Sequence, residues 1–546
     1  MKRIWFIAAF TLAQIMIFGS CYDDKGNYDY QTIDEIKVTF PGSTGKDGNV
    51  IYAQKIGEQL VIHPEIAYPD MENLSFTWEK YKDNRSKETV LLKHAKDLEL
   101  ALEPGDEDAV FKWNVGTYSF RFTIKDTVTG QELQRLVKVV VRSTTPIGVY
   151  VLHGNESESD LATIENSDFM EGLEEPLLTL DYYSSKNSQK LQGAGRGIIW
   201  LYSGVPGLLV VTDRDGKYIN TTTFENIGDL GEICEADAEK NIQRMGFDGS
   251  GGMVYVYTRE QIYTLSLGDE GPEYTRWKSF ASQKEFNAWD PVPGYFFSDF
   301  GFMDNSVCWT SLAYSRAQHS FMLIDYYYSP YLPALCGDDP YNPKFNPQTV
   351  MADMSLIGID YGRDYPDSYY TQDQWAIARK DNGQAIVVLR FNQEGESLEK
   401  ATCDIQTTLA NVQLHPELLA MNCFQMSQDV DGLGYFSTPE GVYSLDVVNG
   451  LSGETEPLFT PDNPGEEIQK IKLLKYNDSS LVEEEETLNA TFTERLGLSL
   501  YVSTWDGTQG RLYRLFLNGE GGIDNTHETE IYEGFNEIRD ICFRLQ

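Results

Sequence analysis

The chain has 546 residues, 84 of them acidic and 44 basic, which gives a formal charge of −40 at pH 7. So negative a chain repels phosphate and shows no basic patch, so a nucleic-acid partner is excluded. Hydrophobic residues make up 41% of the chain, which is typical of a folded protein and excludes a disordered one. This length suffices for roughly two to four domains.

The amino terminus is predicted to be a secretory leader that covers residues 1–20. Lys2 and Arg3 precede an apolar run from Ile4 to Phe18, and two small residues follow it. A basic start, an apolar core and a small-residue exit are the plan of a signal peptide. The apolar run is shorter than the ~20 residues that a membrane-spanning helix needs, so we expect cleavage.

A cysteine follows this leader directly. Phe18-Gly19-Ser20-Cys21 resembles the lipobox of bacterial lipoproteins, in which the leader is cut before the cysteine and the cysteine is lipidated. Lipoproteins favour Leu where Phe18 stands, whereas Gly19 and Ser20 fit the pattern. Several acyl chains anchor a protein stably because each buried methylene contributes about 0.8 kcal/mol. The resemblance predicts a lipid anchor at Cys21, and the alternative is an ordinary leader with an incidental cysteine.

Acidic residues follow the cysteine in a short polar tether, residues 21–32. Tyr22-Asp23-Asp24-Lys25 is similar to the acidic export signal of surface lipoproteins of the Bacteroidota type. We expect Asp23 and Asp24 to act as that signal, and the alternative is that they only solvate the tether. The resemblance implies a lipid-anchored protein of the outer membrane that faces the cell exterior.

Residues 33–145 show the alternation of apolar and polar residues that is typical of half-buried strands. Apolar residues share one face in the segments 74–78, 118–124 and 137–141. A turn at 126–130 is predicted to join the last two of these strands. The region has the size of an immunoglobulin-like β-sandwich.

Particular residues of this region point to a family. Trp78 on a middle strand and Gly116-x-Tyr118 at the start of a late strand match the core and the tyrosine corner of such sandwiches. Together with the tether and the closing valine strand, they resemble the PKD-like lipoprotein family of Bacteroidota. The Phe-Gly-Asp-Gly motif of ordinary PKD repeats is missing after Trp78. The resemblance implies a gene that lies beside a TonB-dependent importer of the SusC/SusD kind.

From residue 146 to residue 546 a hairpin pattern recurs, with an apolar strand, a turn containing Gly, Asp or Asn, and a second strand. The seven occurrences are 149–164, 208–219, 253–267, 307–324, 374–391, 434–447 and 500–517. Hairpins repeated over about 400 residues are the signature of a β-propeller. We predict an all-β protein, with a PKD/immunoglobulin-like sandwich followed by a propeller of about seven blades, six or eight remaining open. Residues 537–546 are expected to close the ring with the first segment.

Motifs of metal and nucleophilic chemistry are absent from the sequence. It contains no His-Glu-x-x-His, no Gly-x-Ser-x-Gly and no Cys-x-x-Cys. The glycine-rich segment 192–200 is interpreted as a turn, because a strand and not a helix is expected after it. Asp213-x-Asp215-Gly and Asp429-x-Asp431-Gly resemble calcium ligands, but Asp-Gly is also a common hairpin turn, which we favour. We predict no cofactor, metal or catalytic residue, although a carboxylate pair of a propeller enzyme stays open.

Two aromatic-rich segments are the best candidates for a contact surface. Both contain Pro and turn residues and are predicted to be loops between blades, where flat rings stack on sugars or grip peptide side chains. The alternative is that these rings pack over the propeller edges. The candidate ligand-contact residues are Tyr326, Tyr327, Tyr328, Tyr331, Tyr369, Tyr370 and Trp375.

The family resemblance implies a non-catalytic accessory of a SusCD-like nutrient uptake system. The expected partners are the importer complex, the outer membrane reached through the lipid anchor, and an oligopeptide or oligosaccharide cargo. Capture by few aromatic contacts is weak, but anchoring beside the importer raises the effective concentration. The alternatives are a propeller hydrolase or lyase that acts on the same polymer, and a purely structural partner without a ligand.

Overall fold

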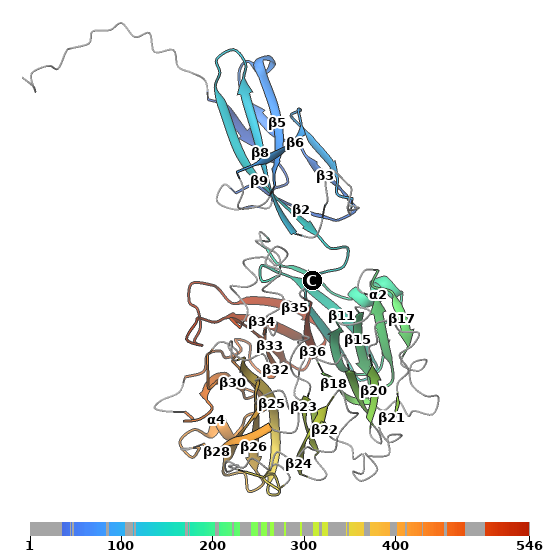
Figure 1. Ribbon diagram of the computed structural model, residues 1–546, viewed down its shortest axis with the longest axis vertical. Helices are drawn as coiled ribbons and strands as arrows, with labels where there is room; N and C mark the ends of the chain where they lie inside the picture. Colours follow the sequence, from blue (N-terminus) through green and yellow to red (C-terminus); the bar gives the residue numbers. More distant parts are fainter. Residues whose placement is uncertain are drawn as a thin grey trace, which may run out of the picture.

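The computed structural model of the full chain is all-β apart from short helical turns (Figure 1). It describes residues 35–43, 45, 49–82, 87–103, 113, 116–169, 173, 175–201, 207–220, 223–229, 242–248, 253–258, 262–266, 278–279, 295–297, 310–315, 319–325, 345–346, 349–364, 372–393, 401–409, 412–427, 430–451, 456–475 and 497–544.

The first nine strands form three sheets at one end of the molecule (Figure 1). Their order is β2-β9-β8-β5-β6 in the largest sheet, with β2 parallel to β9, and β3-β7 and β1-β4 in the two small sheets. The bounds are β1 (Lys37–Thr39), β2 (Ile51–Lys55), β3 (Gln59–Ile62), β4 (Glu65–Ala67), β5 (Leu74–Tyr81), β6 (Thr89–Lys93), β7 (Leu98–Ala101), β8 (Gly116–Asp126) and β9 (Glu132–Arg142). A short 3-10 turn, η1 (Met71–Asn73), precedes β5.

The three sheets enclose one apolar core, as a sandwich requires. Trp78 is fully buried, and its ring stacks on Phe122 with the centroids 4.3 Å apart. Alternate residues of β8 and β9 point into this core, which confirms the strand faces predicted from the period of two. The predicted turn after β8 is also confirmed, because the Asp126 carboxylate accepts the N–H groups of Val128 (2.7 Å) and Thr129 (3.1 Å).

Seven antiparallel sheets make up the described part of residues 148–544, here called the seven-sheet body. Their orders are β12-β11-β10-β36, with β13 beside β11, then β14 to β17, β18 to β21, β22 to β24, β25 to β28, β29 to β31 and β32 to β35. The bounds are β10 (Gly148–Gly154), β11 (Glu158–Glu165), β12 (Leu177–Thr179), β13 (Leu191–Gln192), β14 (Gly195–Leu201), β15 (Gly207–Thr212), β16 (Gly216–Asn220), β17 (Asn226–Asp229), β18 (Ile242–Asp248), β19 (Met253–Thr258), β20 (Ile262–Ser266), β21 (Lys278–Ser279), β22 (Tyr295–Phe297), β23 (Thr310–Ser315), β24 (Ser320–Asp325), β25 (Met354–Asp364), β26 (Gln372–Lys380), β27 (Ile386–Gln393), β28 (Ala401–Thr408), β29 (Cys423–Met426), β30 (Leu433–Ser437), β31 (Val442–Asp446), β32 (Glu467–Leu473), β33 (Ser499–Trp505), β34 (Gly510–Phe516), β35 (Glu530–Phe535) and β36 (Glu537–Arg544). Two short helices, α2 (Tyr182–Asn187) and α4 (Pro416–Leu419), lie between strands.

All seven predicted hairpins are present. They are β10–β11, β15–β16, β19–β20, β23–β24, β26–β27, β30–β31 and β33–β34. The predicted pairing of the last strand with the first segment is confirmed as well, because β36 pairs antiparallel with β10 from Gly148 opposite Arg544 to Gly154 opposite Glu537. The last strand of the chain therefore completes the first sheet.

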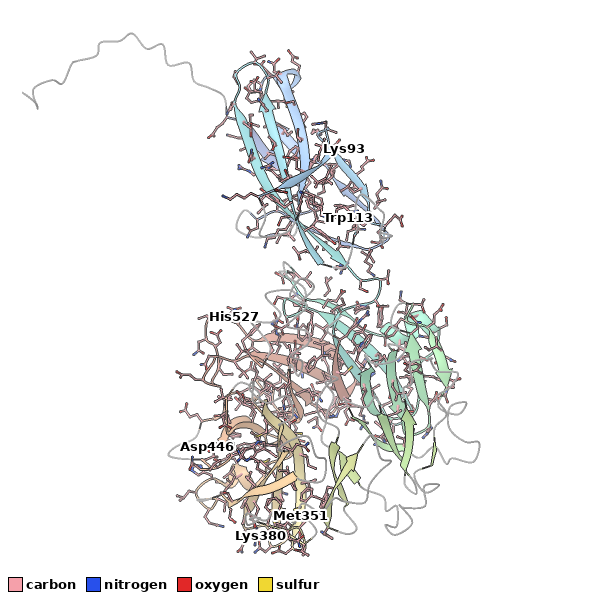
Figure 2. All side chains as sticks on the ribbon, viewed as in Figure 1. Lys93, Trp113, Met351, Lys380, Asp446 and His527 are labelled. Carbon is pink, nitrogen blue, oxygen red and sulfur yellow. The ribbon has the colours of Figure 1, made fainter. Side chains whose placement is uncertain are left out.

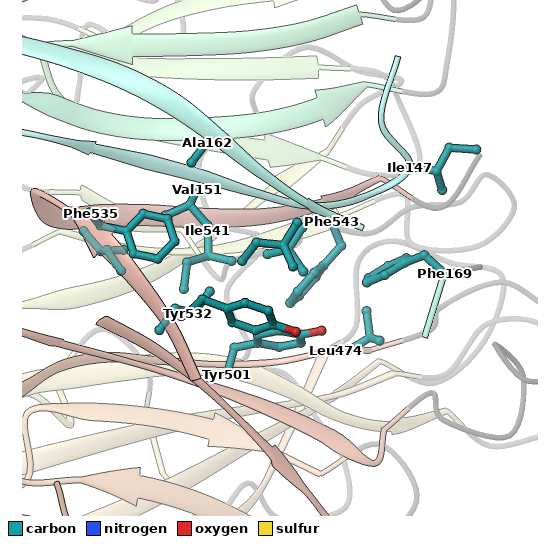
Figure 3. Close-up of a cluster of buried hydrophobic side chains, with 14 of the residues drawn as sticks. Ile147, Val151, Ala162, Phe169, Leu474, Tyr501, Tyr532, Phe535, Ile541 and Phe543 are labelled. Carbon is teal, nitrogen blue, oxygen red and sulfur yellow. The ribbon is translucent and has the colours of Figure 1, made fainter. Parts of the chain in front are cut away.

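We call the edge strands β36, β14, β18, β22, β25, β29 and β32 the first strands of the seven sheets, although β36 comes last in the chain. Six pairs of them lie next to one another, namely β36 and β14, β14 and β18, β18 and β22, β25 and β29, β29 and β32, and β32 and β36. Buried apolar side chains fill the seams between the sheets, and Figure 3 shows one such seam, between the seventh sheet and the first. Because this burial covers both faces, every residue of β10 is buried.

The link between the sandwich and the seven-sheet body is packed and hydrogen-bonded. Thr145 and Ile147 are only 2% and 7% exposed. Arg544, at the end of β36, donates to the carbonyl oxygens of Thr145 (3.4 Å) and Pro146 (3.3 Å). Ile51 of the sandwich belongs to the same buried cluster as Ile147. The sandwich therefore packs against the first sheet, and its Ile51 shares an apolar cluster with residues of the seventh sheet.

An ion pair adds to this contact. Arg142, at the end of β9, lies 3.3 Å from the carboxylate of Glu165 at the end of β11. Val140, on the same outer face of β9, belongs to the buried cluster of the first and seventh sheets. Apolar packing and a charged contact thus act together at the junction.

Candidate functional site

Most of the predicted site residues lie outside the described residues. These are Cys21, Asp23, Asp24, Tyr326, Tyr327, Tyr328, Tyr331, Tyr369 and Tyr370. The lipid anchor, the export signal and the tyrosine contact surface therefore stay predictions. Among the predicted contact residues, the structure describes Trp375.

The prediction that Trp375 lies on an exposed loop is wrong. It is a central residue of β26, paired with Asp360 and Arg390 in the neighbouring strands, and it is 1% exposed. Its ring packs in the apolar seam between the fifth and sixth sheets, beside Met426. A β-carbon at Gly362 would lie 2.8 Å from the indole nitrogen, so the neighbouring strand needs a glycine there. Trp375 is a core residue and not part of a ligand surface.

The turn interpretation of the first Asp-x-Asp-Gly motif is confirmed. The motif connects β15 to β16, and the Thr212 hydroxyl accepts the N–H of Asp215 at 2.9 Å. The carboxylate of Asp213 accepts the N–H of Ala194 at 2.9 Å, and Lys217 lies 3.1 Å from Asp215. Within the described ranges, no three His, Cys, Asp or Glu side chains are grouped so that they could hold a metal ion. Asp429 of the second motif lies outside the described residues.

The interpretation of segment 192–200 as a turn holds only for Gly193 and Ala194, because residues 195–200, with the other two glycines, belong to β14. The expected strand, and not a helix, is therefore present. This removes the geometry of a phosphate-binding loop, which requires the N–H groups of a helix amino terminus.

The structure does bring charged residues together at the first strands of three sheets. Asp540 of β36 accepts a hydrogen bond from Lys470 of β32 at 2.5 Å. Its other carboxylate oxygen accepts the backbone N–H of Ile198 in β14 at 3.1 Å. The Asp540 and Lys470 side chains are 18% and 32% exposed, so solvent reaches this cluster. One carboxylate thus joins the first strands of the seventh, first and second sheets.

The same arrangement recurs between later sheets. Asp360 of β25 accepts the backbone N–H of Met426 in β29 at 2.6 Å and is paired with Lys475, and both charged side chains are buried. The amide oxygen of Gln425 in β29 accepts the N–H of Leu473 in β32 at 3.3 Å. A first strand has one edge without a pairing strand, so its N–H groups need other acceptors. Side chains from the preceding first strand supply them.

These carboxylates are suited to linking sheets. A general base needs a free oxygen within reach of a substrate proton. One Asp540 oxygen is taken by an ammonium group and the other by a backbone N–H. The local sequence does not mark these aspartates, because each shares its strand with other charged residues, Arg363 and Asp364 in β25 and Glu537, Arg539 and Arg544 in β36.

A second group of polar side chains, most of them buried, lies at the seam between the seventh and first sheets. Arg514 of β34 contacts Asp168, which follows β11, and both side chains are 0% exposed. Arg514 also lies 2.8 Å from Glu530, and the Tyr501 hydroxyl donates to Asp168 at 3.1 Å. Asn166 donates to Tyr501 at 3.0 Å. We call Asn166, Asp168, Tyr501, Arg514 and Glu530 the seam network; they tie the first sheet to the seventh.

Comparisons with known proteins show that the amino-terminal part is similar to a known family. Residues 21–194 match the model of the PKD-like family. The matched segment contains the sandwich, the packed link and strands β10 to β13. This part of the chain is therefore PKD-like, and the rest of the chain is all-β.

No curated protein matches the chain. Among solved structures, a DUF4784 family protein from Bacteroides caccae is similar over 93% of this chain and 98% of that chain, at 10% sequence identity and a TM-score of 0.26. In the part of the chain that the structure describes, no helix has the length and apolar character needed to cross a membrane.

Proposed function

We propose that the seven-sheet body is a seven-bladed β-propeller. Seven antiparallel sheets in chain order, first strands that neighbour one another, and a last strand that pairs with β10 support a closed ring. Closure of this kind is a common way for repeated sheets to avoid exposed edges. A crystal structure or a cryo-electron microscopy map tests the ring and the blade count directly.

We propose that the protein is a surface-exposed lipoprotein of the outer membrane, anchored through Cys21 and exported with the help of Asp23 and Asp24. The match to the PKD-like family begins at the cysteine that the leader prediction places first in the mature chain. Mass spectrometry of the amino-terminal peptide tests lipidation. Protease treatment of intact cells tests exposure, and Cys21→Ala should release the protein from the membrane fraction.

We infer that its role is non-catalytic, as an accessory of a SusCD-like uptake system that binds oligopeptide or oligosaccharide cargo, docks on the importer, or does both. The observation that carries this role is the PKD-like match from Cys21 onward. The described charged clusters add support, because their carboxylates and cations hold sheets together.

The distribution of charge supports an orientation in which the seven-sheet body lies away from the membrane. Residues 35–145 contain 15 basic and 17 acidic residues, for a formal charge of −2, whereas residues 146–546 contain 26 and 63, for −37. An anionic membrane surface repels the second part far more than the first. In Figure 2, Met351 and Lys380 mark the end of the seven-sheet body that lies opposite the sandwich. We therefore propose that this end of the seven-sheet body faces the medium.

Binding and cleavage assays on the purified protein test the role. Panels of oligosaccharides and oligopeptides are titrated, and the same mixtures are analysed for cleavage products. Binding without cleavage supports capture and names the cargo class, whereas cleavage replaces the proposal with the hydrolase or lyase. If neither binding nor cleavage is detected, docking on the importer remains as the proposed role, and co-purification with the importer tests it.

A variant with four substitutions tests whether the first tyrosine-rich segment contacts the cargo. Replacing Tyr326, Tyr327, Tyr328 and Tyr331 by Ala should weaken cargo binding at least tenfold and leave the melting temperature unchanged. The matched control is Tyr81→Ala, on the half-buried outer face of the sandwich, which should leave cargo binding unchanged.

A further inference from the structure

Two buried polar side chains face the same side of the first sheet, and each has one polar atom without a partner among the described residues. His153 of β10 and Asp160 of β11 are directly opposite each other in the register and are 3% and 2% exposed. Among the described residues, neither His153 Nε2 nor Asp160 Oδ2 has a hydrogen-bond partner. Buried polar atoms are nearly always paired with protein or with bound solvent, so two opposed exceptions point to a ligand.

The backbone decides which atom of His153 carries the proton. The N–H of Asn536, just before β36, points at His153 Nδ1 at 3.2 Å, so Nδ1 is the acceptor. A neutral imidazole then has its proton on Nε2, which makes Nε2 a donor. Burial lowers the pKa of His153, although the nearby charge of Asp160 opposes this shift, so the ring is neutral at pH 7.

The other side of the pair is an acceptor. Asp160 Oδ1 accepts the N–H groups of Leu161 (2.8 Å) and Ser184 (3.1 Å), the latter in α2. These bonds orient the carboxylate and leave Oδ2 as an unused acceptor. Asp181 and Lys190 are the other charged groups that act on His153, from the start of α2 and the segment after it. The Phe535 ring meets the imidazole edge to face, at 5.6 Å between centroids.

We propose that His153 and Asp160 form a binding site for one small neutral hydroxylic ligand, with water as its resident occupant. An oxygen between them accepts from Nε2–H and donates to Oδ2, so a single hydroxyl group satisfies both. Side chains opposite each other in an antiparallel pair have β-carbons about 4.5–5.5 Å apart, so the ends of the two side chains are near enough for one oxygen to bridge them. The low exposure of both residues limits the ligand to this size.

A metal ion fits this pair poorly. Nε2 carries a proton in the tautomer that Asn536 selects, and a metal would have to displace it. The described residues also hold no third acidic, cysteine or histidine ligand grouped with these two.

Occupancy completes a continuous chain of hydrogen bonds through the first sheet. It runs from the N–H of Asn536 through His153, the ligand and Asp160 to the N–H of Ser184. The chain links the start of the closing strand β36 to helix α2. The site therefore contributes to closure of the first sheet, independently of the proposed cargo.

A crystal structure of the protein at a resolution that orders solvent is the first test. The expected result is one oxygen within hydrogen-bond distance of both His153 Nε2 and Asp160 Oδ2. Two ordered side chains with no oxygen between them, or a direct bond between Nε2 and Oδ2, overturns the proposal.

Nitrogen-15 spectra of labelled histidine test the proton position without any substitution. The Nε2–H tautomer at pH 7 is expected, and the Nδ1–H tautomer overturns the proposal.

A variant pair adds a functional measurement. His153→Phe keeps an aromatic ring but removes the donor, so the oxygen should disappear from the density and the melting temperature should fall. His527→Phe is the control, since His527 is 39% exposed and far from β10 in sequence, and it should leave the oxygen in place. An oxygen retained in His153→Phe with unchanged position overturns the role of the donor.

Discussion

Replacement of Arg514 by Met should destabilise the protein strongly. The guanidinium is 0% exposed and contacts Asp168, Glu530 and the hydroxyl of Ser499. Methionine keeps an unbranched side chain of similar length but leaves the Asp168 charge buried without its partner. Removing one partner of a buried ion pair typically costs about 3–5 kcal/mol. We expect a loss in this range, because Asp168 is 0% exposed and water cannot replace the guanidinium.

A double-mutant cycle measures the coupling within the seam network. Urea unfolding at pH 7, followed by tryptophan fluorescence, gives the free energy of unfolding of Arg514→Met, of Asp168→Asn and of the double variant. The double variant should be more stable than the sum of the two single losses predicts, since the fully buried charge of Asp168 is no longer left unpaired, and Glu530, the other partner of Arg514, is 25% exposed. Lys82→Ala is the control, because Lys82 and Glu88 form an exposed pair that should not change stability measurably. A loss below about 1 kcal/mol for Arg514→Met would refute the account of a buried, uncompensated charge.

Three further predictions concern other parts of the fold. Hydrogen bonds from Tyr68 and from the N–H groups of the turn lower the pKa of Asp126 to about 2. The ionised carboxylate therefore stabilises the sandwich above its usual pKa, and this stabilisation is lost as the pH falls toward 2. In urea unfolding between pH 4 and 2, Asp126→Asn should abolish this part of the pH dependence. Trp375→Ala should lower the free energy of unfolding by about 3–5 kcal/mol, and cargo affinity measured where the variant is folded should not change. Arg544→Gln should reduce the free energy that holds the sandwich against the seven-sheet body by about 1.5–3 kcal/mol, because it removes the hydrogen bonds to the link. The measurement is the distance distribution between spin labels at Lys125→Cys and Lys380→Cys, which should become broader. An unchanged distribution would mean that Arg544 does not hold the link.

Local patterning accounts for most of the correct expectations. The alternation in β8 and β9 predicted their buried faces and the turn between them, because side chains on a strand alternate with a period of two. The seven hairpins and the closing strand also follow from short segments, in which the apolar strands and the turn residues are close in sequence.

Trp375 shows where local patterning fails. Proline, aspartate and tyrosine residues precede it, and this composition is typical of a loop. Its burial depends on the sixth sheet, which packs against β26 from residues some fifty positions further along the chain. Composition alone therefore did not distinguish a loop from a strand that a distant sheet covers.

Sequence patterning thus specified the strands, their pairing within hairpins and the all-β class, because these depend on residues near one another in the chain. Tertiary structure alone decided how the sheets are joined. The seam network connects Asp168 to Arg514, 346 positions apart, and Asp540 reaches the backbone of Ile198, 342 positions away. His153 meets Asn536 across a comparable separation. Sequence periodicity does not predict such pairs, because their members come together only when the sheets have packed and water is excluded from the seams between the sheets.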